Sequence, residues 1–125
     1  MKRKAYNSPN ASVVGPYSHA VGSGDTIYLS GQTPLDATTG NLVEGGIEKQ
    51  TEQCFKNIIS VLESAEMTLE NVEKVCVYLK DMSNFKAMNE IYAQQFSAPY
   101  PARTTIGVSC LPLDAEIEIE VIAKR

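Results

Sequence analysis

The segment at residues 116–123 constrains the fold more than any other feature of the sequence. It reads Glu-Ile-Glu-Ile-Glu-Val-Ile-Ala, so branched apolar residues alternate with glutamates. Successive side chains of a β-strand point to opposite faces, so the pattern predicts a strand with one face in a core and one acidic face. Glu116 and Glu120 are interpreted as part of a solvated face. A chain that contains such a strand must build a sheet with at least one covered face.

Two segments with helical periodicity can supply that cover. Between residues 47 and 65, apolar side chains recur at intervals of three and four, which is typical of a core-facing helix. A second helix is predicted after Ser83, which can cap it, with apolar side chains on one side as far as Phe96. Pro99 and Pro101 then stop it.

Five further segments are predicted as strands from their β-branched content and the turn residues that flank them. They are residues 2–6, 17–21, 26–30, 72–79 and 104–109. The resulting order is β-β-β-α-β-α-β-β, which favours an α+β fold with one six-stranded mixed sheet and two helices on one face. The other face is left for a different cover, such as another subunit.

The length of 125 residues and the hydrophobic content of 43% suit a single domain over residues 1–125. The net charge of −4 and the dispersed Lys and Arg residues argue against a nucleic-acid-binding groove. The apolar runs are short, so no membrane span is expected. The basic residues at the start lead into no apolar segment, so no secretory signal is predicted and the expected location is cytoplasmic.

The sequence offers little support for metal, thiol or nucleotide chemistry. Cys54, Cys76 and Cys110 lack the two-residue spacing of a zinc or redox motif and are interpreted as reduced thiols, the first two as small buried residues. His19 is the only histidine and is expected to be structural, because no metal ligand or triad partner lies at a suitable spacing. The glycines lack the pattern of a phosphate-binding loop, so neither a metal nor a cofactor is predicted.

Arg103 and Glu118 are the candidate functional pair. Arg103 follows Pro101, which restricts the backbone and limits the directions in which the guanidinium can point. Its planar fork suits a small carboxylate. Glu118 lies mid-strand, and a hairpin with the preceding strand would bring it near Arg103, where it could position a water or act as general acid or base. A structural ion pair of Arg103 with Glu118 or an interface acid explains the same residues about equally well.

Five short motifs follow one another along the chain, ahead of the alternating strand. They are Gly-Pro-Tyr-Ser-His-Ala at 15–20, Leu-Ser-Gly-Gln at 29–32, Asn-Glu-Ile-Tyr at 89–92, Pro-Ala-Arg at 101–103 and Leu-Pro at 111–112. Together they resemble the reactive intermediate deaminase family, RidA, also called YjgF and given the older label endoribonuclease L-PSP. The resemblance extends over nearly the whole chain.

The resemblance implies a fold like that of Bacillus chorismate mutase and a homotrimer with ligand clefts between subunits. Members of the deaminase branch hydrolyse 2-imino acids such as 2-iminobutanoate and 2-iminopropanoate, released as enamines by pyridoxal-phosphate (PLP) dehydratases, to 2-keto acids and ammonia without a metal or cofactor. Arg103 matches the arginine that binds the substrate carboxylate, and Glu118 matches the glutamate that orients or activates water. Further pocket positions match Tyr17, Ser30, Gly31 and Asn89.

Two other functions fit part of the pattern. A non-catalytic trimer that binds or senses 2-keto acids would use the same arginine. An endoribonuclease or translation inhibitor, the older label, is disfavoured because the chain has no basic groove and no histidine pair. Some deaminases carry cysteine two residues after the arginine, where this chain has Thr105. That departure weakens the case for regulation by a thiol more than the case for hydrolysis.

Overall fold

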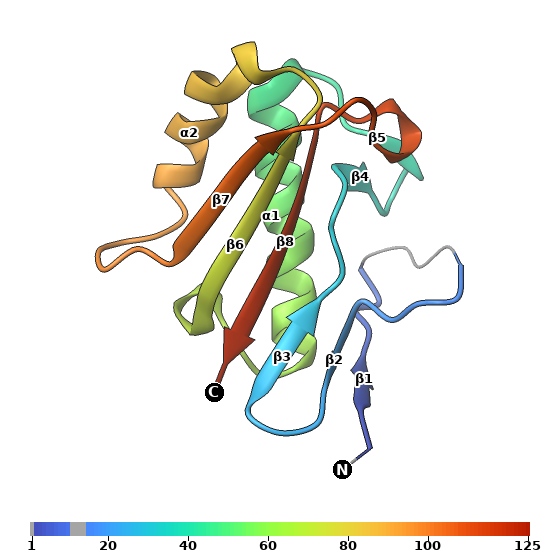
Figure 1. Ribbon diagram of the computed structural model, residues 1–125. Coiled ribbons are helices and arrows are strands. Elements are labelled where there is room, and N and C mark those ends of the chain that lie inside the picture. Colours follow the sequence, from blue (N-terminus) through green and yellow to red (C-terminus); the bar gives the residue numbers. More distant parts are fainter. Residues whose placement is uncertain (1, 11–14) are drawn as a thin grey trace.

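The computed structural model describes residues 2–10 and 15–125, and its centre is a six-stranded sheet in the order β1-β2-β3-β8-β6-β7 (Figure 1). The strands are β1 (Lys4–Tyr6), β2 (Ala20–Gly22), β3 (Thr26–Leu29), β6 (Val72–Leu79), β7 (Ala102–Gly107) and β8 (Ile117–Lys124). β6 and β7 run parallel, and the other neighbouring strands run antiparallel. The predicted α+β fold with a mixed sheet is confirmed, although β2 begins later than expected and leaves Tyr17 in the preceding loop.

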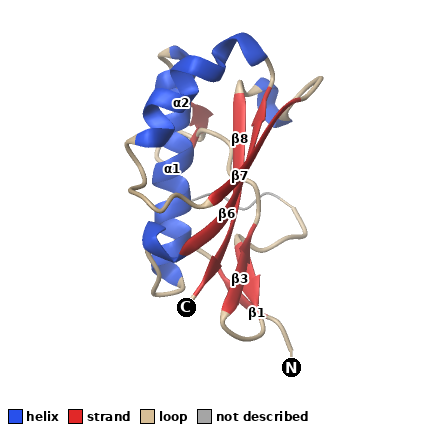
Figure 2. Ribbon diagram, turned by 60° about the vertical axis from the view of Figure 1, so that its left-hand side comes forward, coloured by secondary structure: helices blue, strands red, loops and turns tan. Residues whose placement is uncertain are grey.

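Both helices lie on one face of the sheet, as Figure 2 shows, and this too was predicted from the sequence. The apolar stripe of α1 (Gly46–Ser64) places Phe55, Ile58 and Leu62 in the core, each at most 1% exposed. Burial of each such side chain contributes about 1.5–3 kcal/mol. α2 (Phe85–Ala93) packs beside α1. Within the described ranges, no helix has the length and apolar character needed to cross a bilayer.

β8 alternates as its sequence predicts. Ile117 and Ile119 are fully buried on the helix side, whereas Glu118 and Glu120 lie on the open face and are partly buried. Glu120 accepts a hydrogen bond from the Tyr78 hydroxyl on β6, and this bond raises the pKa of Tyr78. The interpretation of Glu120 as merely solvated is therefore wrong, because a cross-strand neighbour uses its carboxylate.

Several short elements were not predicted. They are a ribbon of β4 (Leu35–Asp36) and β5 (Asn41–Leu42), and the 3₁₀ turns η1 (Leu69–Asn71), η2 (Met82–Asn84) and η3 (Pro112–Asp114). Elements of two or three residues are too short to show a hydrophobic period, so sequence patterns miss them. The ribbon and the turn η3 lie beside each other at the upper right of Figure 1, and both contribute to the candidate site.

The start and end of α2 differ from the prediction. Ser83 does not cap the helix: it lies inside η2, and its backbone N–H donates to the Asp81 carboxylate at 2.9 Å. α2 also ends before Phe96, which nevertheless packs on the rings of Phe55 and Tyr92, with centroids 5.8 and 5.2 Å apart. The apolar period therefore reports which side chains reach the core, and it continues past the hydrogen-bonded helix.

The predicted hairpin between the last two strands of the sheet is wrong. β8 lies between β3 and β6, and β7 lies on the far side of β6. Arg103 is in register with Val75, which is buried on the helix side, and Glu118 is in register with Tyr78 on the open face. Since residues in register share a face of the sheet, the side chains of Arg103 and Glu118 point in opposite directions.

Candidate active site

The predicted site residues fall into two groups within one chain. The arginine half-site is a hollow of about 460 Å³ lined by Asn89, Tyr92, Tyr100, Pro101 and Arg103. The glutamate half-site is a hollow of about 470 Å³ whose walls include Tyr17, Ser30, Gly31, Leu35, Leu113 and Glu118. β6 separates the strands that carry the arginine and the glutamate, so about 10 Å of sheet lies between them. A single chain therefore does not bring both groups to one small ligand.

Arg103 is held by α2 rather than by an acid. Its Nη1 donates to the Asn89 Oδ1 at 2.7 Å, and its guanidinium carbon lies 4.5 Å from the Tyr92 ring centroid and 5.6 Å from that of Phe85. Among residues 2–10 and 15–125, no carboxylate lies within salt-bridge distance of Arg103. The ion pair with Glu118 that was considered from the sequence is therefore absent, whereas the alternative pair with an acid of a neighbouring subunit stays a prediction. A partly buried guanidinium fixed by neutral groups keeps its fork available for an anion.

Within the described residues, two buried hydroxyls near this arginine have no hydrogen-bond partner. The Tyr92 Oη is buried, its residue is only 5% exposed, and burial raises the pKa of its phenol despite the opposing charge of Arg103. The Thr105 Oγ1, two residues along β7 from Arg103 and on the same face, is also buried and unpaired. Unpaired buried hydroxyls cost free energy, so this region has unused hydrogen-bonding capacity.

Glu118 lies in a site that disfavours its charge. Burial raises the pKa of its carboxyl group, and the charge of Glu120 raises it further. Its carboxylate lies against Gly31, where a Cβ atom would be 2.5 Å from the Glu118 Oε2. Only glycine leaves this space free, so the loop after β3 sets the position of the carboxylate. A carboxylate with a raised pKa is suited to accept and return a proton.

The loop residues of the glutamate half-site are fixed by backbone contacts. Ser30 donates its hydroxyl hydrogen to the Ser18 carbonyl at 2.6 Å, and its N–H donates to the His19 carbonyl at 2.8 Å. The Ser30 oxygen therefore keeps lone pairs for a ligand donor. His19 is 1% exposed and accepts the Ser8 N–H at its Nδ1 at 3.0 Å, in agreement with a structural role. Tyr17 lines the same hollow and is 47% exposed.

A family model described as Endoribonuclease L-PSP matches residues 7–125. The chain belongs to this family. It is the family that the five motifs resemble, and its members are also called Rid proteins. The resemblance predicted from the sequence is thus confirmed.

Two relatives of this Rid protein illustrate how far the similarity extends. A RutC family protein of Pyrococcus horikoshii is 46% identical over 125 residues, which cover 100% of this chain and 99% of that protein. A 2-iminobutanoate/2-iminopropanoate deaminase of Mus musculus is 42% identical over 122 residues, covering 97% of this chain and 90% of that protein.

Solved structures share the α+β fold described above. The structure of a putative endoribonuclease from Thermotoga maritima has a TM-score of 0.95 at 40% identity and covers 100% of this chain and 98% of its own. The structure of E. coli TdcF with bound serine has a TM-score of 0.91 at 30% identity, with 98% of each chain covered.

The three thiols of this Rid protein differ in their surroundings. Cys54 is buried as predicted, its Sγ donates to the Gln32 carbonyl at 3.2 Å, and burial raises the pKa of its thiol. Cys76 is not buried in the core, because it lies on the open face opposite Glu120. Cys110 is exposed. All three are free thiols.

The described residues give less support to a metal site or to a second ligand pocket. Within the part of the chain that the structure describes, no three His, Cys, Asp or Glu side chains converge to hold a metal ion. A larger hollow of about 630 Å³ lies between α1 and the β4–β5 ribbon, and Asp36, Lys56 and Ser60 are among its lining residues. It contains none of the predicted site residues, and nothing in it marks a ligand.

Sequence reasoning missed part of each half-site. Tyr92 follows Asn89 by three residues, a spacing that puts both on one helix face, so it could have been found. Leu35 and Leu113 had no such signal, because they belong to a two-residue strand and a single 3₁₀ turn. Their contribution depends on tertiary contacts between segments far apart in the chain.

Proposed function

We propose that this Rid protein hydrolyses reactive 2-imino acids and their enamine tautomers, including 2-iminobutanoate and 2-iminopropanoate, to 2-keto acids and ammonia. The deaminase name of the mouse relative supports this reaction. Arg103 carries the proposal, because it presents a partly buried fork to the arginine half-site with no anion beside it in the described residues. The serine bound to TdcF supports a small amino-acid-like ligand.

In the proposed mechanism, Arg103 binds the substrate carboxylate while Asn89 and the Tyr92 ring hold its guanidinium in place. Glu118 takes a proton from water, and the water oxygen adds to the imine carbon. That proton passes to the nitrogen and gives a carbinolamine. Glu118 then moves the hydroxyl proton of the carbinolamine to the nitrogen, the C–N bond breaks as the C=O bond forms, and ammonia departs from the 2-keto acid. Ser30 accepts a hydrogen bond from the nitrogen. The imine carbon is already electrophilic, so these steps need no metal or cofactor.

We place the complete site between subunits of a homotrimer related in fold to Bacillus chorismate mutase. Arg103 and Glu118 lie on opposite faces of one sheet, so a site that uses both requires two chains. The open face also exposes Tyr28 and Ile106, which are 54% and 45% exposed, and a neighbouring subunit would cover them. PLP-dependent dehydratases acting on serine or threonine in the cytoplasm would supply the imine.

Mixed oligomers are expected to recover activity that neither parent variant has. Arg103→Ala and Glu118→Gln remove different halves of each site. After unfolding and refolding of a 1:1 mixture, about a quarter of the sites in a cyclic oligomer join an intact arginine to an intact glutamate. Recovery to about that fraction of wild-type turnover is expected in a dehydratase-coupled assay of imine loss. The unmixed variants, refolded alone, serve as controls, and a mixture as inactive as its parents would contradict a shared site.

Substitution of Gly31 is expected to disturb the reaction without disturbing the fold. In Gly31→Ala, the new Cβ meets the end of the flexible Glu118 side chain, so the carboxylate must move. A displacement of about 1 Å can cost up to about 100-fold in rate, and we expect a fall of at least 10-fold in kcat. Gly24→Ala is the matched control, because a Cβ there meets nothing within 4 Å. Equal kcat values for the two variants would exclude this role of Gly31.

A binder or sensor of 2-keto acids is the second candidate, since the same arginine would serve it. Turnover separates the two functions. A threonine dehydratase generates the imine, and the decay of the imine is followed with and without this Rid protein. Faster decay that depends on Arg103 supports the enzyme. Unchanged decay, together with saturable binding of 2-ketobutanoate, supports the binder.

A further inference from the structure

Leu113 has a backbone conformation that its side chain disfavours. Its φ is 61° and its ψ is 16°, and the next residue, Asp114, also has a positive φ of 59°. A bulky side chain in the left-handed region clashes with its own backbone, so such residues persist where the surrounding structure holds them, often at functional sites. Leu113 is also 63% exposed, so its own burial does little to compensate for the strain.

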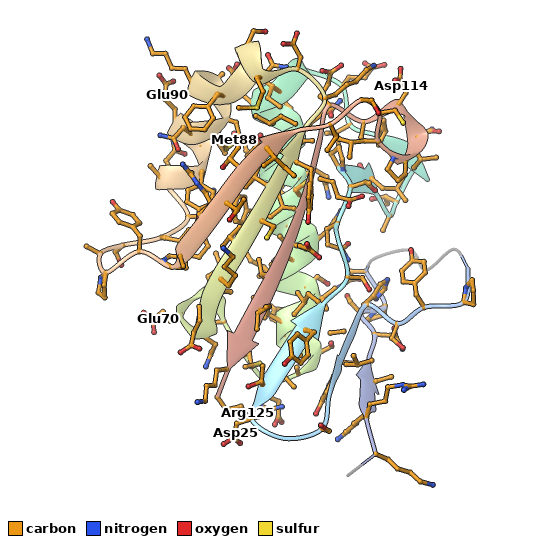
Figure 3. All side chains as sticks on the ribbon, in the orientation of Figure 1. Asp25, Glu70, Met88, Glu90, Asp114 and Arg125 are labelled. Atoms are coloured by element: carbon orange, nitrogen blue, oxygen red, sulfur yellow. The ribbon has the colours of Figure 1, made fainter. Side chains whose placement is uncertain are left out.

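The turn η3 is held firmly in this strained form. Two backbone hydrogen bonds of 3.1 and 3.2 Å close it. Lys80, directly after β6, contacts the Asp114 carboxylate through its Nζ at 2.5 Å, and Figure 3 shows Asp114 on this turn. These contacts hold the backbone of the turn that carries Leu113.

Leu113 forms part of the wall of the glutamate half-site. Pro112 from the same turn and Leu35 from β4 line the same hollow, so two segments far apart in the sequence build one apolar surface. Glu118 and Ser30 lie in that hollow as well. A ligand held beside Glu118 therefore has an apolar surface within the same cavity.

Asn57, a polar residue that lines the same hollow, already has its hydrogen bonds satisfied. Asn57 donates both Nδ2 hydrogens, to the Thr33 carbonyl at 3.0 Å and the Leu35 carbonyl at 2.9 Å. Its Oδ1 accepts from the Gln53 Nε2 at 2.9 Å. Asn57 has little capacity left for a ligand, so the part of a substrate that lies here gains mainly from apolar contact.

Resting on the function proposed above, we infer that Leu113, Leu35 and Pro112 bind the side chain of the substrate and select 2-imino acids with longer aliphatic side chains. The six heavy atoms of 2-iminopropanoate need at most about 180 Å³, at the roughly 30 Å³ that a separate water takes in the liquid, because bonded atoms lie closer together than waters. The hollow of about 470 Å³ also has room for the nine heavy atoms of the leucine-derived 2-imino acid. The reaction is the same hydrolysis, in which water replaces the imine nitrogen and ammonia leaves.

The test compares two substrates made in place by an L-amino-acid oxidase, from alanine and from leucine, with semicarbazide trapping the remaining imine. Wild type is expected to show the higher kcat/KM for the leucine-derived imine. In Leu113→Ala, kcat/KM for that imine is expected to fall about 10-fold more than kcat/KM for 2-iminopropanoate. An equal fall for both substrates, or an unchanged ratio, overturns the inference.

Two further variants separate specificity from folding. Leu113→Gly accepts the positive φ without strain, so it should raise Tm while it loses the preference for the leucine-derived imine. Leu69→Ala removes the same atoms outside the hollow and should keep the preference. If wild type hydrolyses 2-iminopropanoate but the Leu113 variants leave the ratio of kcat/KM between the two imines unchanged, only this inference fails. If wild type hydrolyses neither imine, the proposed function fails.

Discussion

Arg103→Ala is expected to abolish most imine hydrolysis while the proposed oligomer persists. The guanidinium is held toward its half-site by Asn89 and Tyr92 and has no acidic partner in the described chain, so its removal takes away a carboxylate contact and no internal ion pair. Loss of such a contact in a partly desolvated cleft costs about 2–5 kcal/mol. This corresponds to a fall of about 30- to 5,000-fold in kcat/KM. The dehydratase-coupled assay measures the fall, and native mass measurement checks the oligomer.

Two companion variants test whether the lost activity of Arg103→Ala comes from the lost contact with the substrate carboxylate. Arg103→Lys keeps the charge and loses the planar fork, so its kcat/KM should lie between those of wild type and Arg103→Ala. Asn89→Asp keeps the arginine but places a carboxylate where the Asn89 Oδ1 now lies, 2.7 Å from the guanidinium, so it should compete with substrate and raise KM. Near-normal turnover by Arg103→Ala would remove the basis of the proposed function.

Glu118→Gln is expected to reduce kcat by about 100- to 10,000-fold, the usual effect of losing a general base. The amide is close in size to the carboxylate but cannot take a proton from water. The space against Gly31 is kept, so the geometry of the half-site should survive. Glu120→Gln is the matched control on the same face of β8, and it should retain most turnover because Glu120 is hydrogen-bonded to Tyr78.

The Glu118→Gln variant is also expected to be more stable than wild type at neutral pH. Burial and the charge of Glu120 raise the pKa of Glu118 in the folded protein. A raised carboxyl pKa means that the folded protein binds the proton more tightly than the unfolded chain, so stability falls as pH rises through the folded pKa. The penalty is full above that pKa and vanishes below the ordinary value of 4.5.

Thermal melts from pH 4 to pH 8 measure this effect. The Tm of Glu118→Gln should exceed that of wild type at pH 8, and the difference should shrink toward pH 4. Titratable groups near the carboxyl in the described residues include Glu120 on β8, Tyr78 on β6 and the Cys54 thiol on α1, and Tyr17 lines the same hollow. The pKa values of Tyr78 and Cys54 are raised, so neither titrates in this range. A lower Tm for the variant at pH 8 would show that the ionised carboxylate stabilises the assembled protein.

The sequence predicted the elements whose side chains repeat. The stripe of α1 and the alternation of β8 follow from the geometry of a single helix or strand, and both were read correctly because burial imposes a period on local sequence. The motifs identified the family, and with it the residue types of a candidate site. Arg103 was singled out by its chemistry and by the proline before it, before any contact was known.

The tertiary structure alone decided how those elements meet. Strand pairing joins residues far apart in the chain, so no local pattern places β6 between β7 and β8, and the hairpin expected from sequence order was wrong. That order separates the strands of Arg103 and Glu118, and the registers with β6 put the two side chains on opposite faces. The left-handed Leu113 and its contact with the Glu118 hollow were equally hidden, since backbone strain is sustained by the contacts around a residue and leaves no period in the sequence.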